Sequence, residues 1–256
     1  MHRFTGKRIL ITGGSQGIGR ACAIGFAREG GDVAITYSRD DAAAEACRGA
    51  VAAVGSTPRL HKADLGDPAA VDALWADELA GGGCDVLVLN AAFQKKATID
   101  DTDLALLERT FRVNVAGNFQ LAKHFIAARR STAKPGAIVI HSSNQGEFVN
   151  PTGFAYSLTK AALNQMTRHL ALATARDGIR VNCIALGWFD TDGERRFYSA
   201  EQIRAQAERG IPIGRAGDPA EAADLALFLA SDASSYMTGG SVRCDGGYAL
   251  APDSST

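Results

Sequence analysis

The chain has 256 residues, of which 46% are hydrophobic and 21% charged, and its formal net charge is −1. We expect no nucleic-acid partner, no membrane partner and a cytoplasmic location. The sequence has no basic stripe, no apolar run of transmembrane length and no secretory pattern at its start. The five cysteines and five histidines are scattered without metal-ligand spacing, which predicts reduced thiols and no metal site.

Short apolar runs alternate with alanine-rich helical segments along the chain. The strand candidates, of which the third has the weakest pattern, are residues 7–12, 32–37, 57–61, 84–90, 136–142, 179–185 and 240–246. Helical periodicity covers residues 17–29, 40–53, 67–80, 103–130, 155–176 and 219–230. Strands that are apolar throughout are typical of parallel sheets covered on both faces. The alternation predicts an α/β fold with a doubly wound (Rossmann) parallel sheet of about seven strands and helices on both faces.

The sequence favours a single domain over residues 1–256, because no linker, repeat or low-complexity segment interrupts it. Residues 187–217 lack clear strand signals and predict a loop with one or two short helices, acting as a substrate-binding loop or lid. Residues 251–256 resemble a frayed tail. Asp67-Pro68 and Asp218-Pro219 each predict a helix start, with an N-cap residue before a proline.

A glycine-rich turn, "TGGSQGIG" from Thr12 to Gly19, lies between the first strand candidate and the first helix candidate. Glycines let the backbone approach a pyrophosphate, and the helix N-terminus supplies unpaired N–H groups. This context predicts a dinucleotide-binding turn. A P-loop is excluded, because no Lys-Ser or Lys-Thr pair follows the glycines. The expected cofactor-binding residues of the turn are Gly13, Ser15, Gln16, Gly17, Ile18 and Gly19.

The end of the second strand bears on the choice of cofactor. An acid at this position binds the ribose 2′-hydroxyl of NAD(H), whereas a nearby arginine accommodates the 2′-phosphate of NADP(H). Tyr37 stands at the expected acid position, and Ser38 and Arg39 follow it. A hydroxyl and a guanidinium suit a phosphate, so NADP(H) is favoured. Asp40, interpreted as a helix cap, keeps NAD(H) open.

The stretch "FAYSLTK" places Tyr156 four residues before Lys160. On a helix these side chains share one face, about 5–6 Å apart at their bases. A free phenol has a pKa of about 10, and a neighbouring cation lowers it, which would tune a general acid/base. The alternative is a tyrosine packed on the core beside a solvated lysine.

Several motifs in order resemble the short-chain dehydrogenase/reductase family along nearly the whole chain. Besides the glycine turn and the Tyr156–Lys160 pair, these are Asp64-Leu65, "LNAA" at 89–92, Asn114, and Ser143 thirteen residues before Tyr156. The resemblance implies cofactor binding by Asp64, Leu65, Asn90, Ala91, Tyr156, Lys160, Gly187 and Thr191. Two positions depart from the family pattern: Ala92 replaces a glycine, and Leu186 replaces a proline whose loss could loosen the cofactor loop.

The resemblance also implies a mechanism with Tyr156 as general acid/base. Lys160 is expected to lower the Tyr156 pKa and to bind the nicotinamide ribose. Ser143 is expected to donate a hydrogen bond to the substrate oxygen. Asn114 is expected to anchor a water that links Lys160 to solvent. Ser142 is the alternative to Ser143, and His141 is interpreted as a packed strand residue in preference to a catalyst.

The substrate is expected to be a small alcohol or carbonyl compound. Polar groups after the fourth strand, after Ser143 and after Gly187 favour a sugar or polyol, with a 3-oxoacyl thioester or small ketone left open. The expected substrate-binding residues, beside Phe93 and Asn144, are Gln94, Ser143, Gln145, Glu147, Tyr156 and Trp188. A binding protein that senses the cofactor without turnover is a further alternative. The family resemblance implies a homotetramer or homodimer that pairs through the long helices and the last strand.

Overall fold

A sheet of seven parallel strands forms the centre of the structure, a computed structural model that describes residues 2–250. The strand order is β3-β2-β1-β4-β5-β6-β7. The strands are β1 (Arg8–Ile11), β2 (Asp32–Tyr37), β3 (Arg59–Lys62), β4 (Val86–Leu89), β5 (Gly136–His141), β6 (Ile179–Leu186) and β7 (Ser241–Cys244). The predicted doubly wound parallel sheet is confirmed, and the weak candidate at 57–61 forms β3. The expected tail at 251–256 lies outside the described residues.

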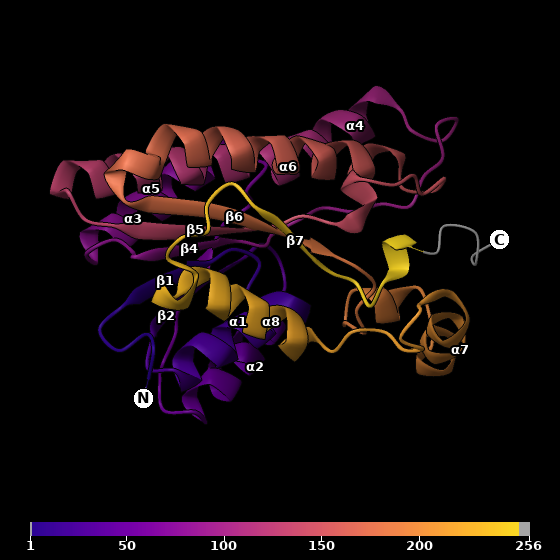
Figure 1. Ribbon diagram of the computed structural model, residues 1–256, viewed down its shortest axis with the longest axis horizontal. Helices are drawn as coiled ribbons and strands as arrows, with labels where there is room; N and C mark the ends of the chain where they lie inside the picture. The colour runs from indigo at the N-terminus through magenta and orange to yellow at the C-terminus, as the bar shows by residue number, and fades with distance from the viewer. Residues whose placement is uncertain (1, 251–256) are drawn as a thin grey trace.

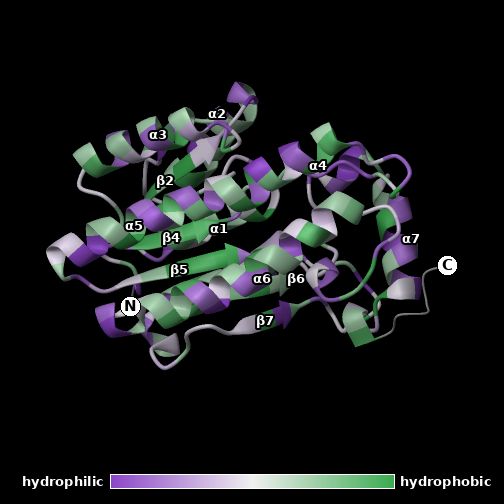
Figure 2. Cartoon of the chain, turned by 90° about the horizontal axis from the view of Figure 1, so that it is seen from above, coloured by the Kyte–Doolittle hydropathy of each residue, from purple (hydrophilic) through white to green (hydrophobic). Residues whose placement is uncertain are grey.

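Two layers of helices cover the two faces of the sheet (Figure 1). One layer holds α3 (Pro68–Ala80), α4 (Leu104–Phe111), α5 (Asn118–Thr132) and α6 (Phe154–Thr174). The other holds α1 (Gly17–Arg28), α2 (Asp41–Ala52) and α8 (Pro219–Ala230), while α7 (Ala200–Gly210) lies beyond the edge of the sheet. The central strand β4 is apolar throughout and β5 is apolar up to its last residue, His141, whereas the helices mix apolar and polar residues (Figure 2). Burial on both faces explains the near-continuous apolar strands of the sequence.

Aspartates begin three of the helices as the sequence predicts. The side chains of Asp40, Asp67 and Asp218 accept hydrogen bonds from first-turn backbone N–H groups at 2.9, 3.0 and 2.8 Å. Pro68 and Pro219 occupy the first helical position, where no N–H is needed. These caps satisfy backbone N–H groups at the starts of α2, α3 and α8.

The expected helix over residues 103–130 is divided in the structure. A π-helical turn, Arg112–Gly117, separates α4 from α5. Asn114 lies in this turn, where its Oδ1 accepts from the Phe93 backbone N–H at 2.6 Å and its Nδ2 donates to Thr159 Oγ1 at 3.0 Å. Periodicity cannot register such contacts with distant segments, and π-turns are frequent at functional sites.

The carboxyl ends of all the strands meet at one edge of the sheet, because the strands are parallel. The strand order reverses between β1 and β4, and ligands of open α/β sheets bind in the crevice at such a point. Residues 187–217, which include α7, lie beyond the same edge (Figure 1). We call this segment the lid. None of the helices within residues 2–250 is long and apolar enough to cross a lipid bilayer.

Candidate active site

The glycine turn between β1 and α1 forms the floor of the candidate cofactor site. Gly13 and Gly17 have φ values of 61° and 51°, in the left-handed region that favours glycine. A Cβ on Gly19 would overlap the Gly13 carbonyl oxygen and lie 2.6 Å from Asn90 Nδ2. The backbone is therefore bare where α1 begins, which fits a pyrophosphate at a helix N-terminus.

A polar network joins the loops after β1, β4 and β5. Thr12 Oγ1 accepts from the backbone N–H groups of Asn90 and Ala91, each at 2.9 Å. Asn90 Nδ2 donates to the carbonyl oxygens of Thr12 and Gly13 at 2.9 Å, and Asn90 Oδ1 lies 2.9 Å from His141 Nδ1. Burial, helped by the Lys160 charge, lowers the pKa of His141 to about 3, so the neutral ring donates to Asn90. His141 is thus a packed strand residue that holds Asn90 in place.

The two departures from the family pattern fit the local backbone. Within residues 2–250, Ala133 is the only non-glycine residue with positive φ, so Ala92 adopts a conformation open to any residue. Leu186 ends β6 in register with Cys244, and the Gly187 N–H donates to the Cys244 carbonyl oxygen at 2.9 Å. Strand pairing therefore fixes the start of the lid where a proline would have stiffened it.

Ser38 and Arg39 lie exposed just beyond β2. Arg39 forms no hydrogen bond or ion pair with any residue in the described part of the chain, so its guanidinium is available to a ligand. Asp40 accepts from Gln16 Nε2 at 2.9 Å, which brings the glycine turn beside this segment. Asp64 pairs with Arg109 at 2.8 Å, a partner that spacing along the chain does not predict.

Ser143, Tyr156 and Lys160 come together at the start of α6. Ser143 follows β5, is only 5% exposed and is hydrogen-bonded to the Tyr156 phenol. Lys160 Nζ lies 5.2 Å from the Tyr156 ring centroid and donates to the His141 carbonyl oxygen at 2.7 Å. Ser142 instead donates to the Lys160 carbonyl oxygen at 3.1 Å, within the packing of α6. This geometry favours Ser143 over Ser142 as the hydroxyl that meets the reacting oxygen.

Burial decides the protonation of this cluster. Burial raises the pKa of Tyr156 above its usual range, the negative charge of Glu194 raises it further, and the Ser143 hydrogen bond opposes both. The expected net lowering of the Tyr156 pKa is therefore wrong for this structure, because burial outweighs the effect of the neighbouring Lys160 charge. Burial also lowers the pKa of Lys160 to about 8. Tyr156 is a neutral phenol at neutral pH, the form that can donate a proton.

Asn114 joins the loop after β4 to α6. It is fully buried, and its amide spans the loop after β4 and α6 through Phe93 and Thr159. Thr159 Oγ1 donates to the Tyr156 carbonyl oxygen at 2.7 Å. Asn114 is thus linked through Thr159 to the backbone of Tyr156, and its catalytic role stays a prediction.

The lid supplies side chains that the sequence did not single out. Trp188 Nε1 donates to Glu194 Oε2 at 3.0 Å, and the Trp188 ring contacts the Tyr198 ring edge to face at 5.8 Å. Lys96, from the loop after β4, donates to the Tyr198 hydroxyl at 2.7 Å. Spacing along the chain gave no signal for Glu194 or Lys96, because their partners meet only in the folded protein.

The expected substrate residues are only partly brought together. Trp188 belongs to the lid wall, and Gln94 lies half-buried in the same loop as Lys96. Gln145 Oε1 accepts from Ser157 Oγ at 3.3 Å, at the start of α6. Glu147 is instead engaged by Arg243 of β7, an ion pair that occupies its carboxylate. The structure therefore does not support the prediction that Glu147 contacts substrate.

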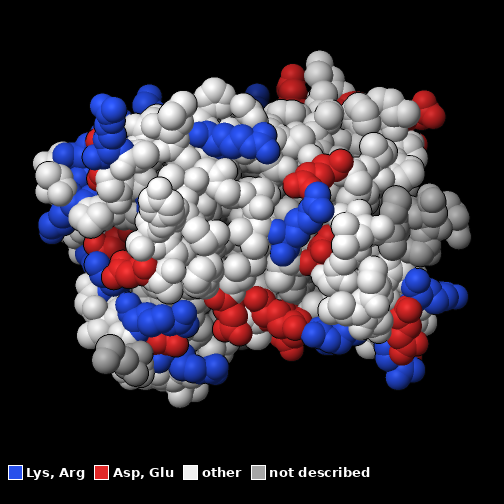
Figure 3. All heavy atoms as spheres, viewed as in Figure 1, with Lys and Arg blue, Asp and Glu red and all other residues white. Residues whose placement is uncertain are grey.

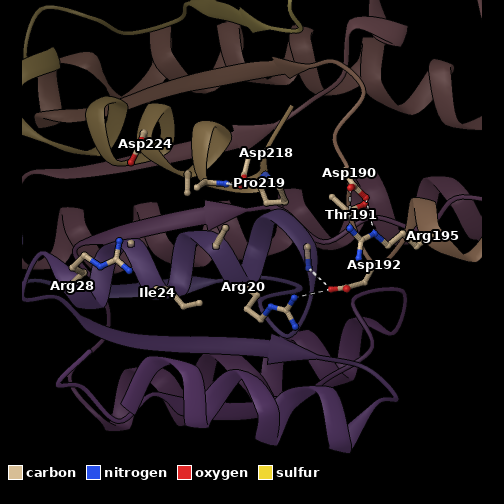
Figure 4. Close-up of a pocket in the computed structure, with 15 residues that line it drawn as sticks. Arg20, Ile24, Arg28, Asp190, Thr191, Asp192, Arg195, Asp218, Pro219 and Asp224 are labelled. Atoms are coloured by element: carbon tan, nitrogen blue, oxygen red, sulfur yellow. Dashed lines mark hydrogen bonds and ion pairs between the residues drawn. The ribbon is translucent and has the colours of Figure 1, made fainter. Parts of the chain in front are cut away.

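A cavity of about 420 Å³ flanks the glycine turn (Figure 4). It is lined by α1, α8 and lid residues 190–195, and not by Ser143, Tyr156 or Lys160. At its end Asp192 accepts from the Gly17 N–H at 3.3 Å and pairs with Arg20 at 3.1 Å. Thr191 packs against Gly17 at the same point. The lid is thereby attached to the cofactor turn.

The fold and the site define a nicotinamide-dinucleotide-dependent oxidoreductase, with a glycine turn for the cofactor and a tyrosine–serine–lysine cluster for the proton. A family model described as enoyl-(acyl carrier protein) reductase matches residues 13–249. General stress protein 39 of Bacillus subtilis is 38% identical over 248 residues, covering 96% of this chain and 85% of that protein.

A second relative and a solved structure agree. L-rhamnose 1-dehydrogenase (NAD(P)(+)) of a Sphingomonas strain is 33% identical, covering 96% of this chain and 98% of that protein. A crystal structure of a short-chain type dehydrogenase/reductase from Mycobacterium marinum superposes with a TM-score of 0.90 at 33% identity, over 96% of this chain and 97% of that one. The chain belongs to the short-chain dehydrogenase/reductase family. It is an NAD(P)(H)-dependent enzyme that transfers a hydride between nicotinamide and a secondary alcohol or carbonyl of a small molecule.

Proposed function

We propose that the enzyme interconverts a hydroxyl of a sugar or polyol and the corresponding carbonyl, with NADP(H) as the preferred cofactor. The observation that carries this proposal is a polar wall beside the start of α6, where Trp188 presents the Glu194 carboxylate and Lys96 donates to the Tyr198 hydroxyl. An acyl-chain pocket would require apolar side chains here. A relative named for L-rhamnose agrees with a polar substrate.

In this proposal Tyr156 donates its proton to the carbonyl oxygen during reduction and takes a proton from the hydroxyl during oxidation. Ser143 donates a hydrogen bond to the same oxygen, where negative charge develops. The Lys160 ammonium, 5.2 Å from the phenol ring, stabilises the phenolate that forms after proton transfer. Asn114 holds the loop after β4 and α6 in register, and the water that it anchors by family resemblance stays a prediction.

The residues fit a dinucleotide cofactor, which supplies or accepts the hydride when bound. The bare turn at Gly13, Gly17 and Gly19 suits the pyrophosphate, and Thr191 of the lid packs against Gly17. Gly187, at the start of the lid, is proposed for the cofactor by family resemblance. Arg39 and Ser38 suit a 2′-phosphate, because both are exposed beside the turn and Arg39 has no ion-pair partner within residues 2–250. Asp64 and Leu65, after β3, are proposed for the adenine.

The remaining proposals concern organisation and surroundings. Residues 1–256 form one domain in which the lid covers the substrate, and the reduced cysteines suit the cytoplasm. Exposed apolar side chains on α4, α5 and α6 support pairing of copies through these helices, as a homodimer or homotetramer. They are Leu104, Phe119, Leu158 and Leu172. Charges of both signs are interspersed over the face shown in Figure 3, where no basic stripe suggests nucleic acid.

A cofactor-resolved turnover screen tests the proposal. Purified protein is mixed with NADP⁺ or NAD⁺ and a panel of aldoses, polyols and simple secondary alcohols, and nicotinamide absorbance is followed. Turnover of a sugar or polyol, faster with NADP⁺, is the expected result. The reverse panel offers NADPH or NADH with small ketones and 3-oxoacyl thioesters. Activity confined to that reverse panel would contradict the sugar assignment and favour the acyl chemistry that the matched family model's description suggests.

A further inference from the structure

Glu194 is a partly buried carboxylate with one oxygen occupied and one available. Its Oε2 accepts from Trp188 Nε1 at 3.0 Å. Its Oε1 accepts no hydrogen bond, and neither oxygen has a cationic partner, among residues 2–250. The neighbouring lid acids differ, because Asp190 pairs with Arg195 and Asp192 pairs with Arg20. Glu194 is thus held in position without being neutralised.

The wall that carries Glu194 lies beside the segment that leads into Tyr156. Ala97, the residue after Lys96, donates its backbone N–H to the Thr152 carbonyl oxygen at 2.8 Å and forms a β-bridge with Gly153. The Glu194 charge is one of the two influences that raise the pKa of Tyr156, after burial. An anion there opposes the phenolate that proton transfer must create. Glu194 therefore does not stabilise the phenolate, and its free carboxylate oxygen is open to a role in binding.

The wall that carries Glu194 consists of lid residues together with Lys96 from the loop after β4, and contacts between them hold it in place. The Lys96 ammonium lies 4.1 Å from the Tyr198 ring centroid and 4.8 Å from that of Phe197, and it donates to the Tyr198 hydroxyl. Tyr198 in turn contacts Trp188 edge to face, and Trp188 positions Glu194. Cation–π contacts of this kind hold a lysine without a carboxylate partner. The wall thus presents Glu194 as a hydrogen-bond acceptor in a fixed position.

We propose that Glu194 is a specificity-determining residue whose free carboxylate oxygen accepts a hydrogen bond from a second substrate hydroxyl, one that does not react. The proposal rests on the sugar or polyol activity proposed above. A carboxylate recognises hydroxyl donors strongly and repels anions. The substrate class is therefore a neutral polyhydroxylated compound, and sugar acids whose carboxylate would face Glu194 are disfavoured.

The inference is tested by changing residue 194 and the substrate hydroxyls in combination and measuring kcat/KM for each pair. The most active neutral sugar from the turnover screen is compared with its monodeoxy analogues, using wild type and Glu194→Gln. Glutamine keeps an oxygen for the Trp188 N–H and removes the charge. Glu208→Gln, an exposed change of the same kind on α7, is the matched control. Cofactor affinity, measured by protein fluorescence, reports whether the lid and the turn stay intact.

With wild type, one deoxy analogue is expected to lose about 10- to 100-fold in kcat/KM, because a charge-assisted hydrogen bond is missing. With Glu194→Gln, the parent sugar loses activity by a similar factor and the deoxy penalty shrinks several-fold. The pH limb of oxidation that reports Tyr156 ionisation moves to lower pH, since the charge that raised the Tyr156 pKa is gone. The limb reports loss of the charge, whereas the change in the deoxy penalty reports binding, and a structural role alone would leave that penalty unchanged.

Two results would overturn the inference. One is an equal penalty for every deoxy analogue in wild type and Glu194→Gln. The other is a Glu194→Gln variant that matches Glu208→Gln on all substrates. Failure of the proposed function is separate, because it would show as no sugar or polyol turnover by the wild-type enzyme in the first screen.

Discussion

The two ends of the sheet differ in whether a buried charged side chain is paired with the opposite charge. At the amino ends of the strands, the Glu78 side chain is fully buried and contacts Arg8, Arg59 and His61 at 3.4, 3.1 and 3.3 Å. At the carboxyl ends, Lys160 is 3% exposed, and the His141 carbonyl oxygen is the hydrogen-bond acceptor recorded for its ammonium within residues 2–250. The buried Glu78 carboxylate at the amino ends is paired with cations. The buried Lys160 ammonium at the carboxyl ends has no carboxylate partner within residues 2–250.

This difference separates stability from chemistry. A buried ion that loses its partners destabilises a fold strongly, so the Glu78 cluster is expected to act on folding. A buried ammonium without a carboxylate partner costs stability, yet it can stabilise a phenolate formed during reaction. Substitutions at the two ends should therefore move different observables.

The largest effect is expected at the carboxyl end, from Tyr156→Phe. Loss of the phenol removes the proton donor, and general acid/base catalysis contributes about 10²- to 10⁴-fold. We expect kcat to fall within that range while cofactor affinity stays near wild type, measured by nicotinamide absorbance and fluorescence titration. Tyr236→Phe, a change at an exposed tyrosine, is the control and should have no effect. Substantial activity in Tyr156→Phe would show that another group carries the proton.

At the other end, Glu78→Gln should act on folding alone. The substitution removes the buried carboxylate that Arg8 and Arg59 share and leaves them the half-exposed Asp32, and we expect the free energy of unfolding to fall by about 3 kcal/mol. Urea titration measures this change, and kcat should match wild type. Glu45→Gln, which removes an exposed i,i+3 pair with Arg48, should cost less than about 1 kcal/mol. A drop in kcat without a change in the free energy of unfolding would contradict the claim that the Glu78 cluster acts on folding and not on catalysis.

A smaller effect is expected from Arg39→Ala, at the cofactor end of the site. Loss of one charge-assisted contact to a 2′-phosphate should weaken NADP⁺ binding by about 10-fold and leave NAD⁺ binding unchanged. Titration of both cofactors measures the ratio, with Arg204→Ala on α7 as an exposed control. Equal weakening for both cofactors would remove Arg39 from the choice of cofactor.

Much of the fold could be predicted from local patterns. Apolar runs and helical periodicity located the strands and helices, and the aspartate caps fixed three helix starts. The π-turn at Asn114 could not be predicted, because hydrogen bonds to Phe93 and Thr159 create it after folding. Periodicity describes one segment at a time, so a break imposed by distant contacts leaves no signal in it.

Site residues that belong to motifs with fixed spacing could be predicted from the sequence. Site residues that are positioned by tertiary packing could not. The glycine turn, Ser143, Tyr156 and Lys160 have fixed spacings, and the structure gathers them at one edge. The predicted direction of the Tyr156 pKa shift was wrong, because the effect of burial outweighs that of a neighbouring lysine. Glu194 was missed and Glu147 misplaced for one reason: the partners Trp188 and Arg243 are known only once the lid and β7 are in place.

Lys160→Met offers the most direct measurement, made as turnover and urea unfolding on one preparation. Burial lowers the pKa of Lys160 to about 8 from its usual 10.5, so the folded state releases a proton that the unfolded state keeps between these values. Wild-type stability should therefore rise from pH 8 to 10.5, and the variant should lack this rise. At pH 7 the variant should lose activity and gain about 1–3 kcal/mol in unfolding free energy. A variant that loses both activity and stability would contradict the claim that the buried Lys160 ammonium lowers stability while it supports catalysis.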